Sequence, residues 1–282
     1  MQLRDRTAPL AVLGSVVSVQ VGQAIGKGLL DAAGPLGVAT VRLTLAAALT
    51  ALLWRPALPR TWRELRPALA LGTAIAGMNV SYLAMARLPL GVAMTLQLLG
   101  PIAVAVGAAR RPRELAWAGL AAVSAALFAD AASITGASAA GLAYGLVSAA
   151  AMALFLVLSA RAAAGDGGAL LTPAMVWAAV LFLPLGALES GGRLLQPSVL
   201  ATGSVVAALS AVVPYALTIA ALRRLPLRVV SILQSLEPVA AGLAGLVILG
   251  EELSAAQWLA IVGITAASVG ATRSAYPARD RS

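Results

Sequence analysis

Long apolar runs, separated by short polar or charged segments, dominate the hydropathy pattern of this chain. A helix needs about 20 mostly apolar residues to cross a bilayer. Short connections marked by proline, glycine or charge leave no room for a soluble domain between the runs. The pattern therefore predicts an all-α membrane protein with ten transmembrane helices. The ten runs are Ala8–Leu30, Pro35–Trp54, Pro67–Ala86, Pro89–Ala109, Leu115–Ala129, Ser138–Ala160, Leu170–Leu188, Val199–Leu222, Leu227–Leu249 and Ala255–Thr272.

One apolar pattern occurs twice in the chain. The segment Leu88–Val106 aligns without a gap to Leu225–Leu243 at an offset of 137 residues, and nine of the 19 positions are identical. Each copy begins next to a proline and holds a second proline in its middle, Pro101 and Pro238. A proline-interrupted apolar segment in corresponding positions of two halves is typical of the binding site of a transporter.

The offset of 137 residues corresponds to five helices, an odd number, so the two copies are expected to run in opposite directions through the membrane. Arginine placement gives the orientation. With the N-terminus in the cytoplasm, 16 arginines fall on the cytoplasmic side and only Arg87 and Arg193 on the outer side. We therefore predict two inverted five-helix repeats, residues 8–130 and 138–272, with both termini in the cytoplasm and the substrate near the midplane.

Composition excludes several classes of function. The chain is 60% hydrophobic and 11% charged, with a mean hydropathy of +0.92, whereas soluble domains carry about 25% charged residues. It has no cysteine and no histidine, so thiol chemistry, histidine-ligated metals and histidine proton relays are excluded, and no cofactor is expected. The net charge of +9 is interpreted as topology signals that face anionic lipid, not as a nucleic-acid site.

Two glutamines mark the repeated helix. A helical proline clashes with the carbonyl four residues before it and leaves that group without its usual partner. Those carbonyls belong to Gln97 and Gln234, and in hydrocarbon they need protein or a wet cavity around them. One interpretation is that both glutamines line a cavity. The alternative is that they only join neighbouring helices through hydrogen bonds.

Charged side chains inside the apolar runs are few. Glu237 is the only acid well inside a run, where insertion costs about 2.5–3.5 kcal/mol. It could bind a substrate ammonium or take up a proton during transport; the alternative is an ion pair with Lys27 or Arg42. Arg42 lies several residues into its run and favours the cavity, whereas Lys27 could equally extend to the membrane interface. Two cations and one acid around a cavity suit a zwitterion such as an amino acid.

Further polar candidates lie in the third and eighth runs. Asn79 and Tyr82 stand three residues apart on one helix face, and Tyr215 follows Pro214. These side chains could donate hydrogen bonds to a substrate. Tyrosines at such positions could also belong to interfacial belts.

Several short motifs resemble those of a known family. They are LPLGVAMTLQLLGPIAV at 88–104, RRP at 110–112, GMN at 77–79, LEP at 236–238 and LGEE at 249–252. Together they resemble the threonine/homoserine exporter family, part of the EamA-domain branch of the drug/metabolite transporter superfamily. The resemblance covers nearly the whole chain and implies ten helices, cytoplasmic termini and export of small amino acids across the inner membrane. It departs at Gln97, where that family has an acid, which leaves Glu237 as the sole acidic candidate.

We therefore expect a secondary exporter of threonine- or homoserine-like amino acids, or related metabolites, that works by alternating access. The chain has no P-loop motif, so a substrate or proton gradient would supply the energy. The alternative is an exporter of another small metabolite or drug on the same fold. The cavity of such a transporter should be rich in aromatic residues, whereas only 4% of this chain is aromatic. An enzyme is disfavoured because the usual nucleophiles and metal ligands are missing. The expected partners are a small-molecule substrate and the lipid bilayer, with no nucleic acid; the chain is expected to be a monomer or a homodimer.

Overall fold

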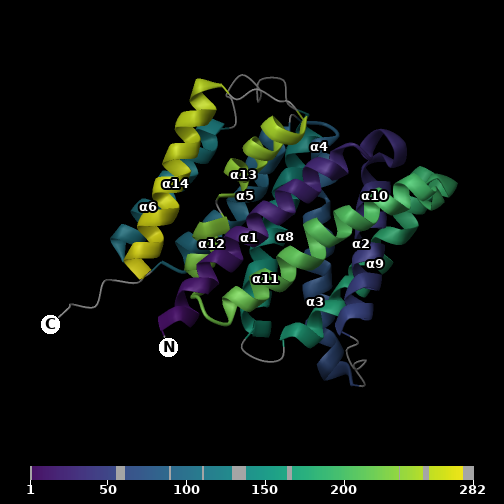
Figure 1. Ribbon diagram of the computed structural model, residues 1–282, viewed down its shortest axis with the longest axis horizontal. Coiled ribbons are helices and arrows are strands. Elements are labelled where there is room, and N and C mark those ends of the chain that lie inside the picture. Colours follow the sequence, from purple (N-terminus) through teal and green to yellow (C-terminus); the bar gives the residue numbers. More distant parts are fainter. Residues whose placement is uncertain are drawn as a thin grey trace.

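The computed structural model describes residues 2–54, 61–88, 90–109, 111–128, 138–163, 167–234, 236–249 and 254–275. Every regular element within these ranges is a helix (Figure 1). The first half contains α1 Gln2–Lys27, α2 Leu30–Trp54, α3 Trp62–Asn79, α4 Ser81–Met85, α5 Leu90–Gly107 and α6 Pro112–Phe128. The second half contains α8 Ala139–Ala163, α9 Gly167–Ser190, η1 Gly191–Leu195, α10 Pro197–Ala207, η2 Ala208–Val212, α11 Val213–Leu222, α12 Leu227–Gln234, α13 Glu237–Ala244, η3 Gly245–Leu249 and α14 Ala255–Ala275.

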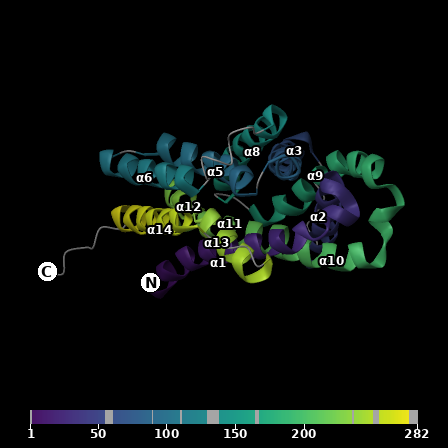
Figure 2. The same ribbon diagram turned by 90° about the horizontal axis from the view of Figure 1, so that it is seen from above.

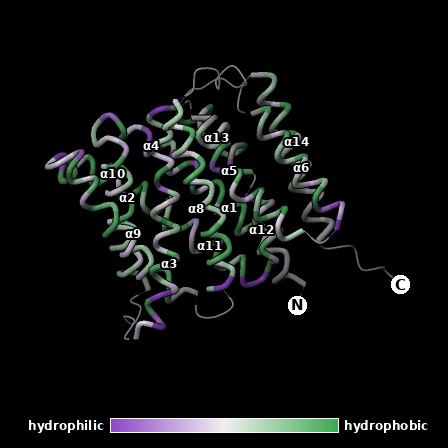
Figure 3. Tube along the Cα trace, turned by 180° about the vertical axis from the view of Figure 1, so that it is seen from behind, coloured by the Kyte–Doolittle hydropathy of each residue, from purple (hydrophilic) through white to green (hydrophobic). Residues whose placement is uncertain are grey.

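Six stretches of the described chain are long and apolar enough to cross a membrane. Shorter apolar stretches lie in α5, in α13 with η3, and in α14. Apolar positions run along the helix shafts, whereas hydrophilic positions gather near their ends (Figure 3). Large apolar side chains stand exposed on these shafts, among them Leu154 on α8 and Leu259 on α14. So much exposed apolar surface requires lipid around it, and the chain is a multi-pass membrane protein. The six stretches are Ala8–Lys27, Leu30–Leu53, Trp62–Met85, Ala139–Ala163, Leu170–Leu195 and Pro197–Leu222.

Helices from the two halves pack against each other throughout the molecule. The helix α2 lies along α9, and α6 lies along α14. Between these pairs, α8 packs against α3 and α5, while α1 packs against α11 and α13. The pair α6–α14 occupies one end of the long axis, and α9 and α10 occupy the other (Figures 1 and 2). The middle of the molecule is therefore built from α1, α5, α8, α11 and α12–α13.

A break near the start of α2 shows how the α2–α9 pair is fixed. Gly34 has a φ of 66°, a left-handed conformation that glycine adopts without steric cost. The helix restarts at Pro35, and its free backbone N–H groups need acceptors. The carboxylate of Glu189, near the end of α9, accepts hydrogen bonds from the N–H groups of Leu36 and Gly37 at 2.7 and 2.9 Å. An acid of α9 therefore caps α2 across the interface between the halves.

The connections gather at the two ends of the helix bundle. The start of α1 and the turn between α11 and α12 lie at one end, and the turn after α4 lies at the other (Figure 1). The chain therefore enters α5 and α12, which carry the two copies of the repeated pattern, from opposite ends.

Candidate functional site

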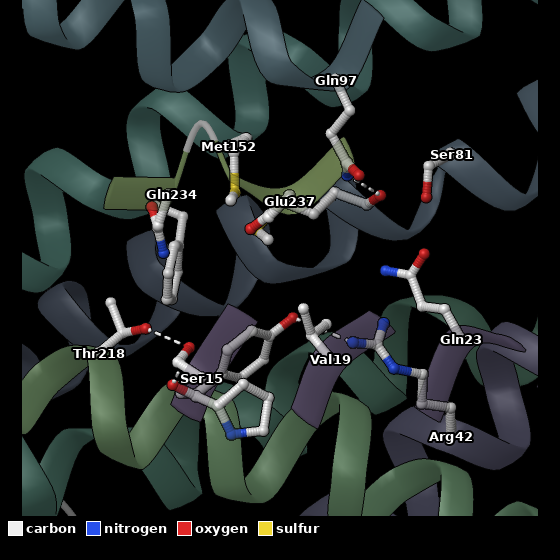
Figure 4. Close-up of a pocket in the computed structure, with 14 residues that line it drawn as sticks. Ser15, Val19, Gln23, Arg42, Ser81, Gln97, Met152, Thr218, Gln234 and Glu237 are labelled. Atoms are coloured by element: carbon white, nitrogen blue, oxygen red, sulfur yellow. Dashed lines mark hydrogen bonds between the residues drawn. The ribbon is translucent and has the colours of Figure 1, made fainter. Parts of the chain in front are cut away.

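A cavity lies between the two halves. Side chains from α1, α2, α3, α4 and α5 meet those from α8, α11, α12 and α13 around it (Figure 4). The lining residues are Ser15, Val19, Gln23, Arg42, Met78, Ser81, Gln97, Met152, Phe155, Pro214, Tyr215, Thr218, Gln234 and Glu237.

The residues that line the cavity follow the sequence repeat, and they do so outside the segment in which the repeat was detected as well. Four pairs of lining residues stand 137 positions apart, which is the offset of the repeat. Equivalent positions of the two halves therefore face one space from opposite sides. The pairs are Ser15 with Met152, Met78 with Tyr215, Ser81 with Thr218, and Gln97 with Gln234.

Arg42 is the cation of the cavity, and only 4% of its surface is exposed. Its Nε–H donates to Ser210 Oγ at 2.7 Å, its Nη1 donates to Asn79 Oδ1, and its Nη2 donates to the Ser210 carbonyl. A guanidinium has five N–H groups, so these three bonds leave two for other acceptors. One of these two is used by Nη2, which also donates to Tyr215 OH at 3.5 Å, so one N–H group is left. Among the described residues, no carboxylate pairs with Arg42.

A local distortion places Ser210 against Arg42. Residues Ala208–Val212 form the π-helical turn η2, in which the Val213 N–H bonds to the Ala208 carbonyl. Such turns widen a helix and often occur at functional sites. Gly22 of α1 packs directly on this turn, because a Cβ there would lie 2.8 Å from both the N and the Cβ of Ser210. The close approach of α1 therefore depends on glycine at this position.

Glu237 is the acid of the cavity and stands at the first residue of α13. The preceding helix α12 ends at Gln234, so the second copy of the repeat is interrupted at this point. A carboxylate at a helix N-terminus is stabilised by the partial positive charge of the free N–H groups. Within the described residues, neither a hydrogen bond nor an ion pair to the Glu237 carboxylate is found, so the alternative of a pair with Arg42 is not realised.

The two repeat-related glutamines differ in their bonding. The Gln97 amide donates to Ser148 Oγ at 2.8 Å and to the Met78 carbonyl at 3.3 Å, and Ser148 also donates to that carbonyl at 2.9 Å. The Oε1 atoms of Gln234 and Gln23 are buried and have no partner in the described structure. Both residues line the cavity. These oxygens can therefore accept hydrogen bonds from a bound molecule.

Arg42 and Glu237 approach the cavity from different walls and are not bonded to each other (Figure 4). The cavity thus presents a guanidinium on one side and a carboxyl group on the other, with amide and hydroxyl groups between them. Such a set of groups matches a small molecule that carries both charges, because buried charges require partners.

The structure gathers five of the eight residues predicted as site residues at the cavity: Gln97, Gln234, Glu237, Arg42 and Tyr215. The other three lie outside the lining. Asn79 is buried behind Arg42 and bonds to it. Tyr82 is buried next to Gly26 of α1, and its hydroxyl has no partner among the described residues. Lys27 is the last residue of α1 and is half-buried.

Several lining residues were not predicted as site residues. Ser15 donates to the Pro214 carbonyl and lies 3.0 Å from Thr218 Oγ1, and Ser81 and Gln23 complete the polar lining. Serine and threonine are also common at packed helix interfaces in membranes, so their types alone do not indicate a site. The 137-residue offset would have pointed to Ser81 and Thr218 as a pair. Among the described residues, no three acidic side chains gather as a metal site would require.

Comparisons with known proteins identify relatives of this chain. Residues 139–273 match the EamA-like transporter family. The threonine/homoserine exporter RhtA of Salmonella typhimurium (strain SL1344) is 36% identical over 266 residues, covering 93% of this chain and 90% of the relative. RhtA of Escherichia coli (strain K12) is 36% identical over 264 residues with the same coverage. A crystal structure of another protein, 16% identical, covers 96% of this chain and 99% of its own with a TM-score of 0.75, which shows a shared fold.

Proposed function

Since this chain belongs to the EamA-like transporter family, we propose that it exports small amino acids such as threonine and homoserine across the inner membrane. The observation that carries the proposal is the guanidinium of Arg42 and the carboxyl group of Glu237, which line the central cavity and are not bonded to each other. The relatives named as threonine/homoserine exporters favour this substrate class.

An amino-acid zwitterion matches the cavity group by group. Its carboxylate accepts a hydrogen bond from the Arg42 N–H group that the four protein bonds leave free. Its ammonium donates to the Glu237 carboxylate and to the free Oε1 of Gln234. Bound in this way, both charges of the substrate are compensated away from water, which lowers the cost of carrying them through the membrane.

The rest of the lining suits a short polar side chain. Ser15, Ser81 and Thr218 supply hydroxyl groups, which both donate and accept hydrogen bonds. Of the aromatic residues, Phe155 and Tyr215 line the cavity. This mixture favours a small hydroxylated amino acid over the alternative, an exporter of another small metabolite or a drug, for which a more aromatic wall is expected.

We further propose that the chain forms two inverted five-helix repeats, residues 8–130 and 138–272, which move against each other in alternating access. The four pairs of lining residues at the repeat offset support this arrangement. So do the packing partners, because α8 contacts α3 and α5 as α1 contacts α11 and α13. In this arrangement the cavity lies between the repeats, where rocking would open it to each side in turn.

The orientation can be tested with single cysteines, because the natural chain has none. Arg87→Cys and Pro226→Cys lie at exposed turns. With cytoplasmic termini, we expect an impermeant thiol reagent added to intact cells to label Arg87→Cys and not Pro226→Cys. Labelling of both from the same compartment contradicts the inverted arrangement.

Export can be tested with purified protein in liposomes loaded with radiolabelled threonine. We expect threonine efflux above the rate of empty liposomes, and competition by homoserine from the same side. In cells that lack exporters, expression should protect against toxic levels of threonine or homoserine. Efflux equal to that of empty liposomes, together with no protection by any amino acid, contradicts the proposal.

A further inference from the structure

A second hollow, separate from the central cavity, lies where α3, α8 and α9 meet. Arg63 and Arg66 reach it from the first turns of α3, and Arg161 reaches it from the last turn of α8. All three side chains are exposed. The described residues that line this hollow include no acid. The hollow is therefore a concentrated positive site that is not neutralised by its own walls.

The ends of three membrane spans show at which level of the membrane this hollow lies. The span Trp62–Met85 begins here, Ala139–Ala163 ends here, and Leu170–Leu195 begins here. The arginines thus lie at the level where the hydrocarbon gives way to the polar headgroups.

The remaining wall of the hollow is apolar. Leu71 is buried, and Leu158 and Leu170 are half-buried. These side chains continue from the arginines toward the middle of the membrane spans. A free phosphate or carboxylate could contact only the charged rim, whereas a molecule with an anionic head and a hydrocarbon tail could contact both parts.

We propose that this hollow is a binding site for an anionic phospholipid, with the phosphodiester between Arg63, Arg66 and Arg161 and an acyl chain against Leu158 and Leu170. The planar guanidinium donates in a fork that matches phosphate oxygens. Basic pockets between membrane helices bind anionic headgroups in this way. The site contacts α3 and α8, so a bound lipid stabilises the packing of these two helices. This inference does not rest on the identity of the exported substrate.

The test uses the full-length protein in a neutral detergent, titrated with short-chain phosphatidylglycerol while binding is followed by thermophoresis. Each arginine near an anionic headgroup contributes about a factor of five in affinity, so Arg66→Ala with Arg161→Ala should weaken binding roughly 30-fold. The matched control is Arg111→Ala with Arg113→Ala, two exposed arginines near the start of α6. The control should bind as the wild type does. Raising the salt concentration should weaken wild-type binding, because exposed charges are screened.

Three results would overturn the proposal. One is equal binding of phosphatidylglycerol by the double variant and the wild type. Another is equal binding of short-chain phosphatidylcholine, which would show an apolar groove without charge selectivity. The third is competition by inorganic phosphate as effective as that by the lipid, which would show a site for a free anion. If the alanine variant does not fold, Arg66→Lys with Arg161→Lys replaces it. Lysine keeps the charge and loses the forked donor geometry, so weaker binding than wild type with retained salt dependence is then expected, and unchanged binding would overturn the proposal.

Discussion

The helix α5 and the pair α12–α13 carry the two copies of one sequence pattern, yet they differ where they meet the cavity. The helix α5 continues unbroken through Pro101. Gly100 in this helix packs so tightly against the Ala149 carbonyl of α8 that a Cβ would not fit. At the equivalent position of the second copy stands Glu237, at the start of α13 after α12 has ended. A glycine in one copy closes a helix interface, and a carboxylate in the other faces the cavity.

The glutamines repeat the same contrast. Gln97 is bonded to Ser148 and to the Met78 carbonyl, whereas Gln234 presents an unpartnered Oε1. The first copy therefore works as a fixed wall, and the second supplies groups that are free to bind. A duplicated backbone thus provides two similar surfaces, and a few substitutions assign them different tasks. The predictions below test this division, beginning with the largest expected effect.

Removing the charge of the second copy should have the largest effect. We expect Glu237→Gln to lower threonine efflux roughly a hundredfold, because loss of one partner of a buried charge pair costs about 2–5 kcal/mol. The control Asp31→Asn removes an exposed acid in the first turn of α2 and should leave efflux unchanged. The measurement is the initial efflux rate from liposomes, with the amount of inserted protein determined in parallel. Wild-type efflux from Glu237→Gln would remove this residue from the mechanism.

Changing the opposite wall should have the next largest effect. We expect Arg42→Lys to raise the KM for threonine roughly tenfold or more, because lysine cannot reproduce the forked donor geometry. It also leaves Asn79 Oδ1 or the Ser210 carbonyl without its donor. Arg193→Lys, at the 3-10 turn η1, is the matched control outside the cavity. An unchanged KM in Arg42→Lys would show that the guanidinium does not bind the substrate.

Substitutions in the fixed wall should change the stability of the protein. We expect Gly100→Ala to destabilise the protein by about 1–3 kcal/mol, because the new methyl group overpacks the α5–α8 interface. In the same helix, a Cβ at Gly107 meets no atom within 4 Å, so Gly107→Ala should be neutral or slightly stabilising. The midpoint of thermal unfolding in detergent measures both. Equal midpoints for the two variants would contradict tight packing at Gly100.

The glutamine variants should give the smallest effects. One should change mainly stability, and the other should change mainly the KM for threonine. We expect Gln97→Leu to lower stability by about 1 kcal/mol, because it removes hydrogen bonds within the fold. Gln234→Leu removes a buried oxygen without a partner, so it should leave stability unchanged and raise the KM for threonine a few-fold. Thermal midpoints and KM values of both variants decide this. Equal losses of stability would favour the interpretation that both glutamines only join helices.

Much of the site could be predicted from the charged and polar residues that stand in apolar segments of the sequence. Gln97, Gln234, Glu237 and Arg42 stand out in the sequence because each is costly to bury in hydrocarbon, and all four line the cavity. Hydroxyl residues such as Ser15 carry no such signal, since small polar residues also pack helices together. The prolines predicted a helix interruption in both copies of the repeat. Only the helix of the second copy is interrupted, next to Glu237, because tertiary packing decides whether a helix continues.

The π-helical turn η2 could not be predicted, since nothing in its apolar sequence marks a widened helix turn. Its position follows from packing, with Gly22 of α1 on one side and Arg42 of α2 on the other. The sequence also predicted ten spans, whereas length and hydropathy identify six in the described chain. Of the other four expected runs, three coincide with shorter apolar stretches among the described residues, in α5, in α13 with η3 and in α14, and the fifth run coincides with α6.

The central claim is that one molecule bridges Arg42 and Glu237 through its carboxylate and its ammonium. The most direct test is competition for radiolabelled threonine exchange in liposomes by unlabelled threonine, N-acetylthreonine and threonine amide. We expect threonine to compete and both analogues to compete at least tenfold more weakly, because each lacks one of the two charges. If N-acetylthreonine and threonine amide compete as well as threonine, the cavity does not recognise a zwitterion and the assignment is wrong.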